Sequence, residues 1–284
     1  MLNICQKIDE IRSIILDAKS HGKVISFVPT MGSLHEGHLQ LIKKAQLQSD
    51  FVIVSIFVNQ KQFNQQQDFN KYPRNLEQDL QKLKNIGVNA VFTPSNNEIY
   101  PEDNLITINI KNIDQILCGK DRAGHFNGVA LIIVKLFAII TPDVAIFGLK
   151  DYQQFFIIKR LVNELNFNIK IIGIDTVRQE SGLALSSRNL RLSKIATKIS
   201  KNIYFILNDI KKQILADNNI NIDELLQISS QKLLDLGFDE VIYLEIRNED
   251  NLDLCQKFNP NKKYRIFICV MIEGVRLIDN INLS

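Results

Sequence analysis

The stretch Pro29-Thr30-Met31-Gly32-Ser33-Leu34-His35-Glu36-Gly37-His38 decides the fold of this chain. An apolar run, Val24 to Val28, precedes it, and apolar residues at helical spacing follow it up to Ala45. This order predicts a buried strand, a tight turn and a helix whose first turn carries both histidines on one face. Because a helix N-terminus exposes amide groups and glycines admit a ligand close to the backbone, the segment predicts a phosphate-binding site.

Two other interpretations of the histidine pair are open on these residues alone. Two histidines three residues apart could form half of a metal site, or they could be partly exposed side chains without a specific function. The cysteines give no support to a metal site, because they stand far apart at positions 5, 118, 255 and 269 without a close pair.

Composition narrows the class of protein. The chain has 284 residues, of which 45% are hydrophobic and 23% charged, and a formal net charge of +3, too small to indicate a nucleic-acid partner by itself. The longest apolar stretch, Val129 to Ile140, is interrupted by Lys135 and is too short to span a bilayer. With dispersed cysteines and no visible signal peptide, we expect a cytoplasmic protein without membrane or nucleic-acid partners.

Residues 1–175 alternate between strand-like and helix-like segments. Most of the strand-like segments are continuous apolar runs, as expected for parallel strands covered on both faces. This alternation predicts a Rossmann-like, doubly wound α/β domain, with ligands beyond the carboxyl ends of its strands. The expected strands are Val24–Val28, Phe51–Val58, Ala90–Thr93, Leu105–Ile110, Val144–Phe147 and Ile169–Ile174, and the expected helices are 3–20, 37–48, 75–86, 127–140 and 151–166.

The pattern changes beyond residue 175. Helical stretches at 194–215 and 222–236 are followed by strand-like segments at Glu240–Arg247, Tyr264–Ile272 and Val275–Ile278, with Glu273-Gly274 as a hairpin turn between the last two. We therefore expect a smaller C-terminal α+β domain over residues 176–284.

Three further segments are polar and marked by glycine. They are Cys118 to Val129, Phe147 to Gln154 and Arg178 to Asn189. Each has an ordinary interpretation: a loop with a helix cap, a solvated surface lysine, and a cap before Ser193. Each also offers cations or hydroxyls that can bind phosphate, with Lys150 placed between a strand and a helix.

Taken together, these segments resemble the HxGH nucleotidylyltransferase superfamily and, within it, the pantothenate synthetase (pantoate–β-alanine ligase) family. The resemblance covers essentially the whole chain. The stretches that carry it are PTMGSLHEGHLQLI from Pro29, FVNQKQF from Phe57, YPR from Tyr72, RAGHFNGV from Arg122, FGLKDYQQ from Phe147 and SGLALSSRN from Ser181.

The resemblance implies a site for ATP. His38 and His35 would stabilise the phosphates, with His38 as the family's proposed proton donor, and Lys150 would contact the α-phosphate, so these three are the catalytic candidates. The second domain would close over the nucleotide as a lid. The implied ATP-binding residues are Met31, Gly32, Ser33, Leu34, His35, Glu36, Gly37, His38, Gly148, Leu149, Lys150, Asp151, Val177, Leu185, Ser186, Ser187 and Arg188.

The resemblance also implies sites for the other reactants. Gln62 and Gln154 would bind pantoate, and Asp79 would lie near a Mg²⁺–pyrophosphate group. Secondary candidates around the same cleft are Asn59, Tyr72, Arg122 and His125. The family joins pantoate to β-alanine with ATP, through an acyl adenylate, and is usually dimeric, so we expect a homodimer with ATP and Mg²⁺ as co-substrate and metal.

The chain departs from the family pattern at a few positions. It has Gln60 and Ala123 where proline is common, Leu149 and Gln78 where an acidic residue is frequent, and Leu185 where methionine is common. None of these changes removes a charged candidate. Two rival functions fit these residues less well: a nucleotidylyltransferase acting on a phosphate ester, which would lack the FVNxxQF segment and the glutamines after Lys150, and a non-catalytic nucleotide- or RNA-binding protein, which would need a basic patch.

Overall fold

The computed structural model describes residues 2–102 and 105–283 of the chain. The chain divides into two compact units, residues 1–175 and 176–284. No helix among the described residues is long and apolar enough to cross a membrane. Cys5, Cys118, Cys255 and Cys269 are buried and form no disulfide bond.

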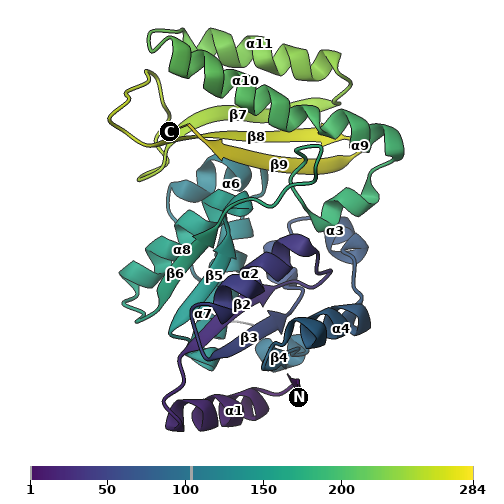
Figure 1. Ribbon diagram of the computed structural model, residues 1–284, viewed down its shortest axis with the longest axis vertical. Coiled ribbons are helices and arrows are strands. Elements are labelled where there is room, and N and C mark those ends of the chain that lie inside the picture. The colour runs from purple at the N-terminus through teal and green to yellow at the C-terminus, as the bar shows by residue number, and fades with distance from the viewer. Residues whose placement is uncertain (1, 103–104, 284) are drawn as a thin grey trace. The chain divides into compact units, whose positions relative to one another are not determined.

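The first unit is built around a six-stranded sheet of parallel strands in the order β1-β4-β3-β2-β5-β6 (Figure 1). This confirms the expected doubly wound α/β fold. The strands are β1 (Asn3–Cys5), β2 (Ile25–Thr30), β3 (Phe51–Ile56), β4 (Ala90–Phe92), β5 (Val144–Gly148) and β6 (Lys170–Ile174). The α-helices are α1 (Ile8–Ser20), α2 (Glu36–Gln46), α3 (Gln66–Lys71), α4 (Leu76–Ile86), α5 (Asn96–Ile99), α6 (Leu117–Asp121), α7 (His125–Ile140) and α8 (Tyr152–Glu164), and the 3-10 turns are η1 (Gln60–Gln62), η2 (Ile113–Gln115) and η3 (Leu149–Asp151).

Both faces of this sheet are buried, because successive strand residues enter different apolar clusters. Phe27 packs into a cluster with residues of α1, α7 and α8, whereas the next residue, Val28, packs with residues of α2 and α4. On β3, Ile53 packs into the first of these clusters and Val54 into the second. Side chains of a strand point alternately to its two faces, so a strand covered on both sides must be apolar throughout.

The strand order places a topological switch point between β2 and β5. From β2 the chain continues to β3 and β4 on one side, then crosses to β5 and β6 on the other. β2 and β5 are parallel neighbours, with Ser26 opposite Val144 and Phe27 opposite Ala145. In open α/β sheets, ligands bind beyond the carboxyl ends of strands at such a point.

One predicted strand of this unit was wrong, and one predicted helix begins later than expected. Leu105–Ile110 is not a strand: Leu105 and Ile106 are 98% and 76% exposed, and the Ile110 N–H donates to the side chain of Asn127 instead of to a neighbouring strand. The predicted helix over 3–20 begins only at Ile8, because Asn3–Cys5 pairs with β4 as an edge strand.

The second unit holds a three-stranded antiparallel sheet, β7-β8-β9, with helices packed on it (Figure 1). Its turn at Glu273 and Gly274 has φ of +49° and +68°, as a two-residue hairpin requires, so this predicted turn is confirmed. The predicted helix over 194–215 is two helices that break at Lys201. The elements are η4 (Ser187–Arg191), α9 (Lys194–Ser200), α10 (Asn202–Ala216), α11 (Ile222–Asp235), β7 (Glu240–Asn248), β8 (Tyr264–Ile272) and β9 (Val275–Asn282).

Candidate active site

The turn after β2 has a backbone shape that depends on glycine. Gly32 has a φ of +79° and Ser33 a φ of +53°. A Cβ atom at Gly32 would lie 3.1 Å from Asp79 Oδ2 and 3.1 Å from Ile56 Cγ2. The Gly32 N–H donates to the hydroxyl of Thr30 at 3.2 Å. The left-handed backbone and the close neighbours together account for glycine at this position.

The carboxylate of Asp79, on α4, holds the next two amides of the turn. Its Oδ2 accepts a hydrogen bond from the Ser33 N–H at 2.7 Å, and its Oδ1 accepts one from the Leu34 N–H at 2.8 Å. Asp79 is only 2% exposed. Charge-assisted hydrogen bonds of this kind compensate a buried carboxylate for its lost water. The shape of the turn is therefore fixed by α4 before any ligand binds.

Each histidine of the turn uses Nδ1 as a hydrogen-bond acceptor. His35 is the N-cap of α2 and accepts from the Gly37 N–H at 3.2 Å, while His38 accepts from the His35 N–H at 3.3 Å. A ring nitrogen that accepts carries no hydrogen, so in both neutral rings the hydrogen lies on Nε2. The two rings, whose centroids are 4.1 Å apart, thus present two N–H donors.

Both histidines are neutral at pH 7. Burial lowers the pKa of His35 to about 4, with help from the positive charge of Lys150. Burial, then the neighbouring His35 and then Lys150, lower the pKa of His38 to about 3. The charge of Lys82 lowers both pKa values further. A neutral pair agrees with the acceptor role of each Nδ1, since protonation there would break a hydrogen bond to the backbone.

Lys150 approaches the same site from β5. It lies in η3, directly after the strand, with a side chain that is 18% exposed and a nitrogen 3.9 Å from the carboxylate of Asp151. Because β2 and β5 are parallel neighbours, their carboxyl ends share one edge of the sheet. The structure thus brings Lys150 together with His35 and His38 at the switch point. Gly148 ends β5, and Leu149 to Asp151 form η3 between it and α8.

Gln62 has a buried side chain that is held by hydrogen bonds to neighbouring side chains. It is 8% exposed, its Nε2 donates to the sulfur of Met31 at 3.2 Å, and its Oε1 accepts from Asn59 at 3.1 Å. Asn59 is itself 1% exposed, donates to the Gly128 carbonyl and accepts from the hydroxyl of Tyr100. Asn59 therefore holds the amide of Gln62 beside the turn.

Arg122 and His125 hold the backbone carbonyl of Gln62. His125 Nδ1 donates to this oxygen at 2.7 Å and an Arg122 nitrogen donates to it at 3.2 Å. A second Arg122 nitrogen lies 2.9 Å from His125 Nε2, which accepts from it. Arg122 and His125 therefore contact Gln62, the residue predicted to bind pantoate, and fix the position of its backbone.

The two glutamines after Asp151 have different surroundings. Gln153 is 4% exposed, accepts from the Cys118 N–H and donates to the carbonyls of Ile113 and Ile116. Gln154 is partly buried and has no side-chain hydrogen bond within the described part of the chain. Gln153 therefore anchors a loop, whereas the amide of Gln154 is available to a ligand.

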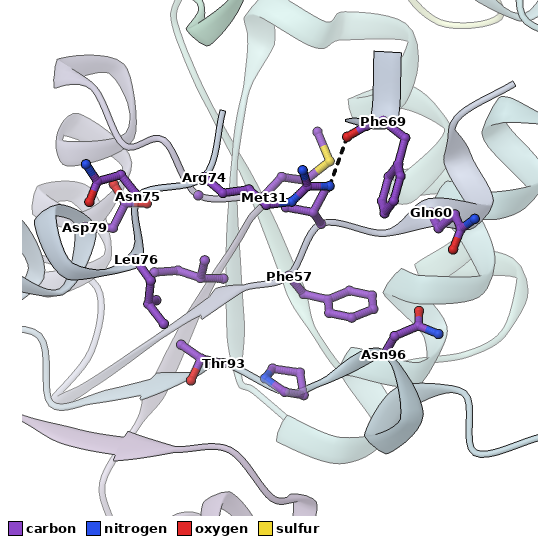
Figure 2. A pocket seen from close by; sticks show the side chains of 14 residues that line it. Met31, Phe57, Gln60, Phe69, Arg74, Asn75, Leu76, Asp79, Thr93 and Asn96 are labelled. Atoms are coloured by element: carbon purple, nitrogen blue, oxygen red, sulfur yellow. Dashed lines mark hydrogen bonds between the residues drawn. The ribbon is translucent and has the colours of Figure 1, made fainter. Parts of the chain in front are cut away.

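A pocket of about 370 Å³ lies beside the turn, at the ends of β3 and β4 (Figure 2). Figure 2 shows Arg74 at this pocket, with its guanidinium donating to the carbonyl of Phe69. Met31 and Asp79 also line it. The pocket therefore adjoins the turn, but the histidines and Lys150, all of them described, do not line it. Tyr72 is 9% exposed and stacks its ring edge to face with Phe63, at 5.8 Å between centroids.

The candidates of the second unit lie on a loop that is held within that unit. The Leu185 N–H donates to the Val177 carbonyl at 2.9 Å, and the Ser186 hydroxyl accepts from the Arg188 N–H as the N-cap of η4. Ser187 and Arg188 are the first two residues of η4. Arg178, which follows Val177 directly in the sequence, donates to both carboxylate oxygens of the buried Asp279.

Sequence reasoning missed one charged residue of the site, Lys82. Its ammonium donates to the Leu34 carbonyl at 2.6 Å. The available signal was its spacing, because Lys82 follows Asp79 by three residues and therefore shares its face of α4. The supporting roles of Gln153 and Tyr100 had no signal in the sequence.

The fold and the site define a doubly wound α/β protein with an HxGH-type turn: a glycine-supported turn and helix N-terminus carry two N–H donors, with a lysine beside them at the switch point. The family model described as pantoate-beta-alanine ligase matches residues 3–282. The chain belongs to this family.

Curated relatives and solved structures agree with this assignment along the whole chain. Pantothenate synthetase of Neisseria meningitidis serogroup C is 44% identical over 280 residues, which cover 98% of this chain and 99% of the relative. The pantothenate synthetase structure from Thermus thermophilus has a TM-score of 0.91 at 33% identity, over 99% of each chain. The pantoate-beta-alanine ligase from Francisella tularensis, complexed with beta-gamma ATP and beta-alanine, has a TM-score of 0.82 at 41% identity, over 100% of this chain and 98% of that one.

Proposed function

We propose that this chain is an ATP-dependent ligase that condenses (R)-pantoate with β-alanine to give pantothenate, AMP and diphosphate. The observation that carries the proposal is the match of residues 3–282 to the pantoate-beta-alanine ligase family. The grouping of His35, His38 and Lys150 at the switch point supports it, since such a group of donors and one cation suits a triphosphate.

The proposed reaction has two steps. A carboxylate oxygen of pantoate attacks the α-phosphorus of ATP, and the bond to diphosphate breaks, which leaves pantoyl adenylate. The amine of β-alanine then attacks the activated carbonyl, loses a proton, and displaces AMP. Negative charge grows on phosphate oxygens in the first step, so the chemistry needs oriented donors and cations rather than a covalent nucleophile.

In this proposal, the histidines act as neutral donors. His35 and His38 would donate from Nε2 to phosphate oxygens, beside the amides at the start of α2. A pKa of about 3 leaves His38 without an imidazolium proton at neutral pH. We therefore propose hydrogen bonding, rather than the proton transfer expected from the family, as the role of His38. Lys150 would neutralise charge at the α-phosphate.

Pantoate would lie between Gln62 and Gln154. Burial of Gln62 and its contact with Met31 put an amide against the turn, and the Asn59 contact keeps that amide oriented. The amide of Gln154 can pair with a hydroxyl or carboxylate of the substrate. A small hydroxy acid held by two amides is positioned for attack on the nucleotide.

The proposed Mg²⁺ would be bound mainly by the triphosphate. The described residues contain no group of three His, Cys, Asp or Glu side chains that could hold a metal ion. Asp79 uses one lone pair on each oxygen for the turn, so only its remaining lone pairs could face a metal. When bound, Mg²⁺ would neutralise phosphate charge. Metal binding by Asp79 stays a prediction.

Several other expectations from the sequence also stay predictions. They are the nucleotide contacts of Val177 and Leu185 to Arg188, the action of the second domain as a lid, the homodimer and the cytoplasmic location. The four buried cysteines form no disulfide bond, which agrees with a reducing compartment.

A direct assay tests the proposed function. Purified protein with MgATP, pantoate and β-alanine should release diphosphate and form AMP and pantothenate, and product formation should need both organic substrates. Omitting β-alanine should leave a single turnover of diphosphate release, because adenylate forms and remains bound. If diphosphate release did not require pantoate and instead required a phosphate ester, the protein would be a nucleotidylyltransferase and not this ligase.

A further inference from the structure

Leu34 is held at both of its backbone polar groups by one helix. Its N–H donates to Asp79 Oδ1 at 2.8 Å, and its carbonyl accepts from Lys82 Nζ at 2.6 Å. Asp79 and Lys82 are three residues apart on α4 and so lie on the same face. The residue that follows Leu34 is His35, the N-cap of α2. These two hydrogen bonds therefore fix the start of α2, where we propose that phosphate binds.

The charge of Lys82 also acts on the site. Its ammonium is close enough to both histidines to oppose their protonation, as Lys150 does from η3. An ammonium has three N–H donors, and the Leu34 carbonyl needs one of them. Lys82 is partly buried, which reduces the screening of its charge by water. A neutral histidine pair thus lies close to two ammonium groups from different elements.

We propose that Lys82 is a further cation of the triphosphate site, which fixes the turn through the Leu34 carbonyl and adds positive charge beside His35 and His38. This inference rests on the proposed function, because it takes the bound anion to be the triphosphate of ATP. Lys150, after β5, serves the α-phosphate, and Lys82 approaches from α4, so it would serve the diphosphate leaving group. Charge develops on that group as the bond to the α-phosphorus breaks.

Three substitutions at position 82 separate charge from hydrogen bonding. Lys82→Arg keeps both, Lys82→Gln keeps a donor for the Leu34 carbonyl but loses the charge, and Lys82→Met loses both. Lys84→Gln, exposed on the same helix, removes the same charge elsewhere and is the matched control. The readouts are KM for MgATP, KM for pantoate and kcat, measured by diphosphate release, with thermal unfolding to check the fold.

We expect Lys82→Gln and Lys82→Met to raise KM for MgATP on the order of tenfold, because hydrogen bonds to charged groups contribute that much. KM for pantoate should stay unchanged, and Lys82→Arg and Lys84→Gln should resemble the wild type. Added salt should raise KM for MgATP more steeply in the wild type than in Lys82→Gln.

The inference is overturned if folded Lys82→Gln keeps the wild-type KM for MgATP and its salt dependence, since the ammonium would then serve only the backbone. It is also overturned if Lys84→Gln raises this KM as much as Lys82→Gln. Failure of the proposed function has a different result, namely no pantoate-dependent diphosphate release by the wild-type protein.

Discussion

Gly128 of α7 lies directly against the backbone of Lys61 in η1. A Cβ atom at position 128 would fall 2.2 Å from the Lys61 carbonyl oxygen and 2.8 Å from the Gln62 nitrogen. Backbone atoms cannot move aside as the end of a flexible side chain can. The close approach also brings the Gly128 carbonyl to Asn59, which orients Gln62. The packing of one glycine therefore sets the position of the proposed pantoate-binding amide.

We expect Gly128→Ala to cost about 1–3 kcal/mol of stability, because the added methyl forces the backbone of η1 to shift. The same shift should displace Gln62 and raise KM for pantoate more than KM for MgATP. Urea unfolding and steady-state kinetics measure the two effects. Ala138→Ser, exposed on the same helix, is the control. An unchanged KM for pantoate in Gly128→Ala would show that the packing of Gly128 does not position the pantoate site.

Asp79→Asn should destabilise the turn. An amide keeps one acceptor for Ser33 or Leu34 but aims N–H donors at the other, so a loss of about 1–3 kcal/mol and a higher KM for MgATP are expected. Glu77→Gln, exposed on α4, is the control. A Mg²⁺ titration distinguishes the two roles of Asp79: recovery of activity at high Mg²⁺ would favour a metal ligand, and no recovery would favour support of the turn.

Lys150→Ala should lower kcat by roughly 10²–10³-fold, the usual cost of removing a group that stabilises charge in a transition state. Single-turnover formation of adenylate, with β-alanine omitted, measures the affected step. Lys159→Ala, exposed on α8, should leave it unchanged. Wild-type adenylate formation by Lys150→Ala would remove Lys150 from the mechanism.

Stability should fall on acidification below about pH 6.5. An unfolded histidine has a pKa near 6.5, whereas the folded protein holds the pKa of His35 at about 4 and that of His38 at about 3. Between these values the unfolded state binds more protons, so stability rises with pH. Urea unfolding from pH 4 to 7 measures the slope. His38→Gln should flatten it, and His21→Gln, which removes an exposed histidine, should not.

The adjacent glutamines of α8 should respond differently to substitution. Gln153→Ala removes the hydrogen bonds to the Cys118 N–H and to the Ile113 and Ile116 carbonyls and should cost about 2 kcal/mol or more of stability. Gln154→Ala should leave stability unchanged and raise KM for pantoate. Thermal unfolding and pantoate kinetics on both variants test this. The reverse pattern would contradict the assignment of Gln154 to the substrate.

The sequence predicted those parts of the structure that local pattern controls. The strand, turn and helix around His35 follow from an apolar run, two glycines and helical spacing, and the hairpin at Glu273 follows from its two-residue turn. The strand predicted at Leu105–Ile110 failed because an apolar pattern needs a partner strand, and those residues have none. The strand Asn3–Cys5 was missed because three residues carry little pattern and its formation depends on distant β4.

The contacts that hold the site residues in place could not be predicted from the sequence, because they join residues that are far apart in the chain. His125 and Arg122 reach the Gln62 carbonyl across about sixty residues, and a contact from a side chain to a distant backbone group leaves no periodic signal. Lys82 shares a helix face with Asp79, but its contact with the Leu34 carbonyl depends on how α4 packs against the turn, which local pattern does not predict.

The commitment of both Nδ1 atoms to backbone amides has a consequence for unwanted ligands. An imidazole coordinates a transition metal through a nitrogen lone pair, and at His35 and His38 the Nδ1 lone pair accepts a backbone N–H while Nε2 carries the hydrogen. Zinc or copper could be captured only after a ring gave up its backbone contact and changed tautomer. We therefore expect the same geometry to disfavour the binding of trace transition metals by this pair.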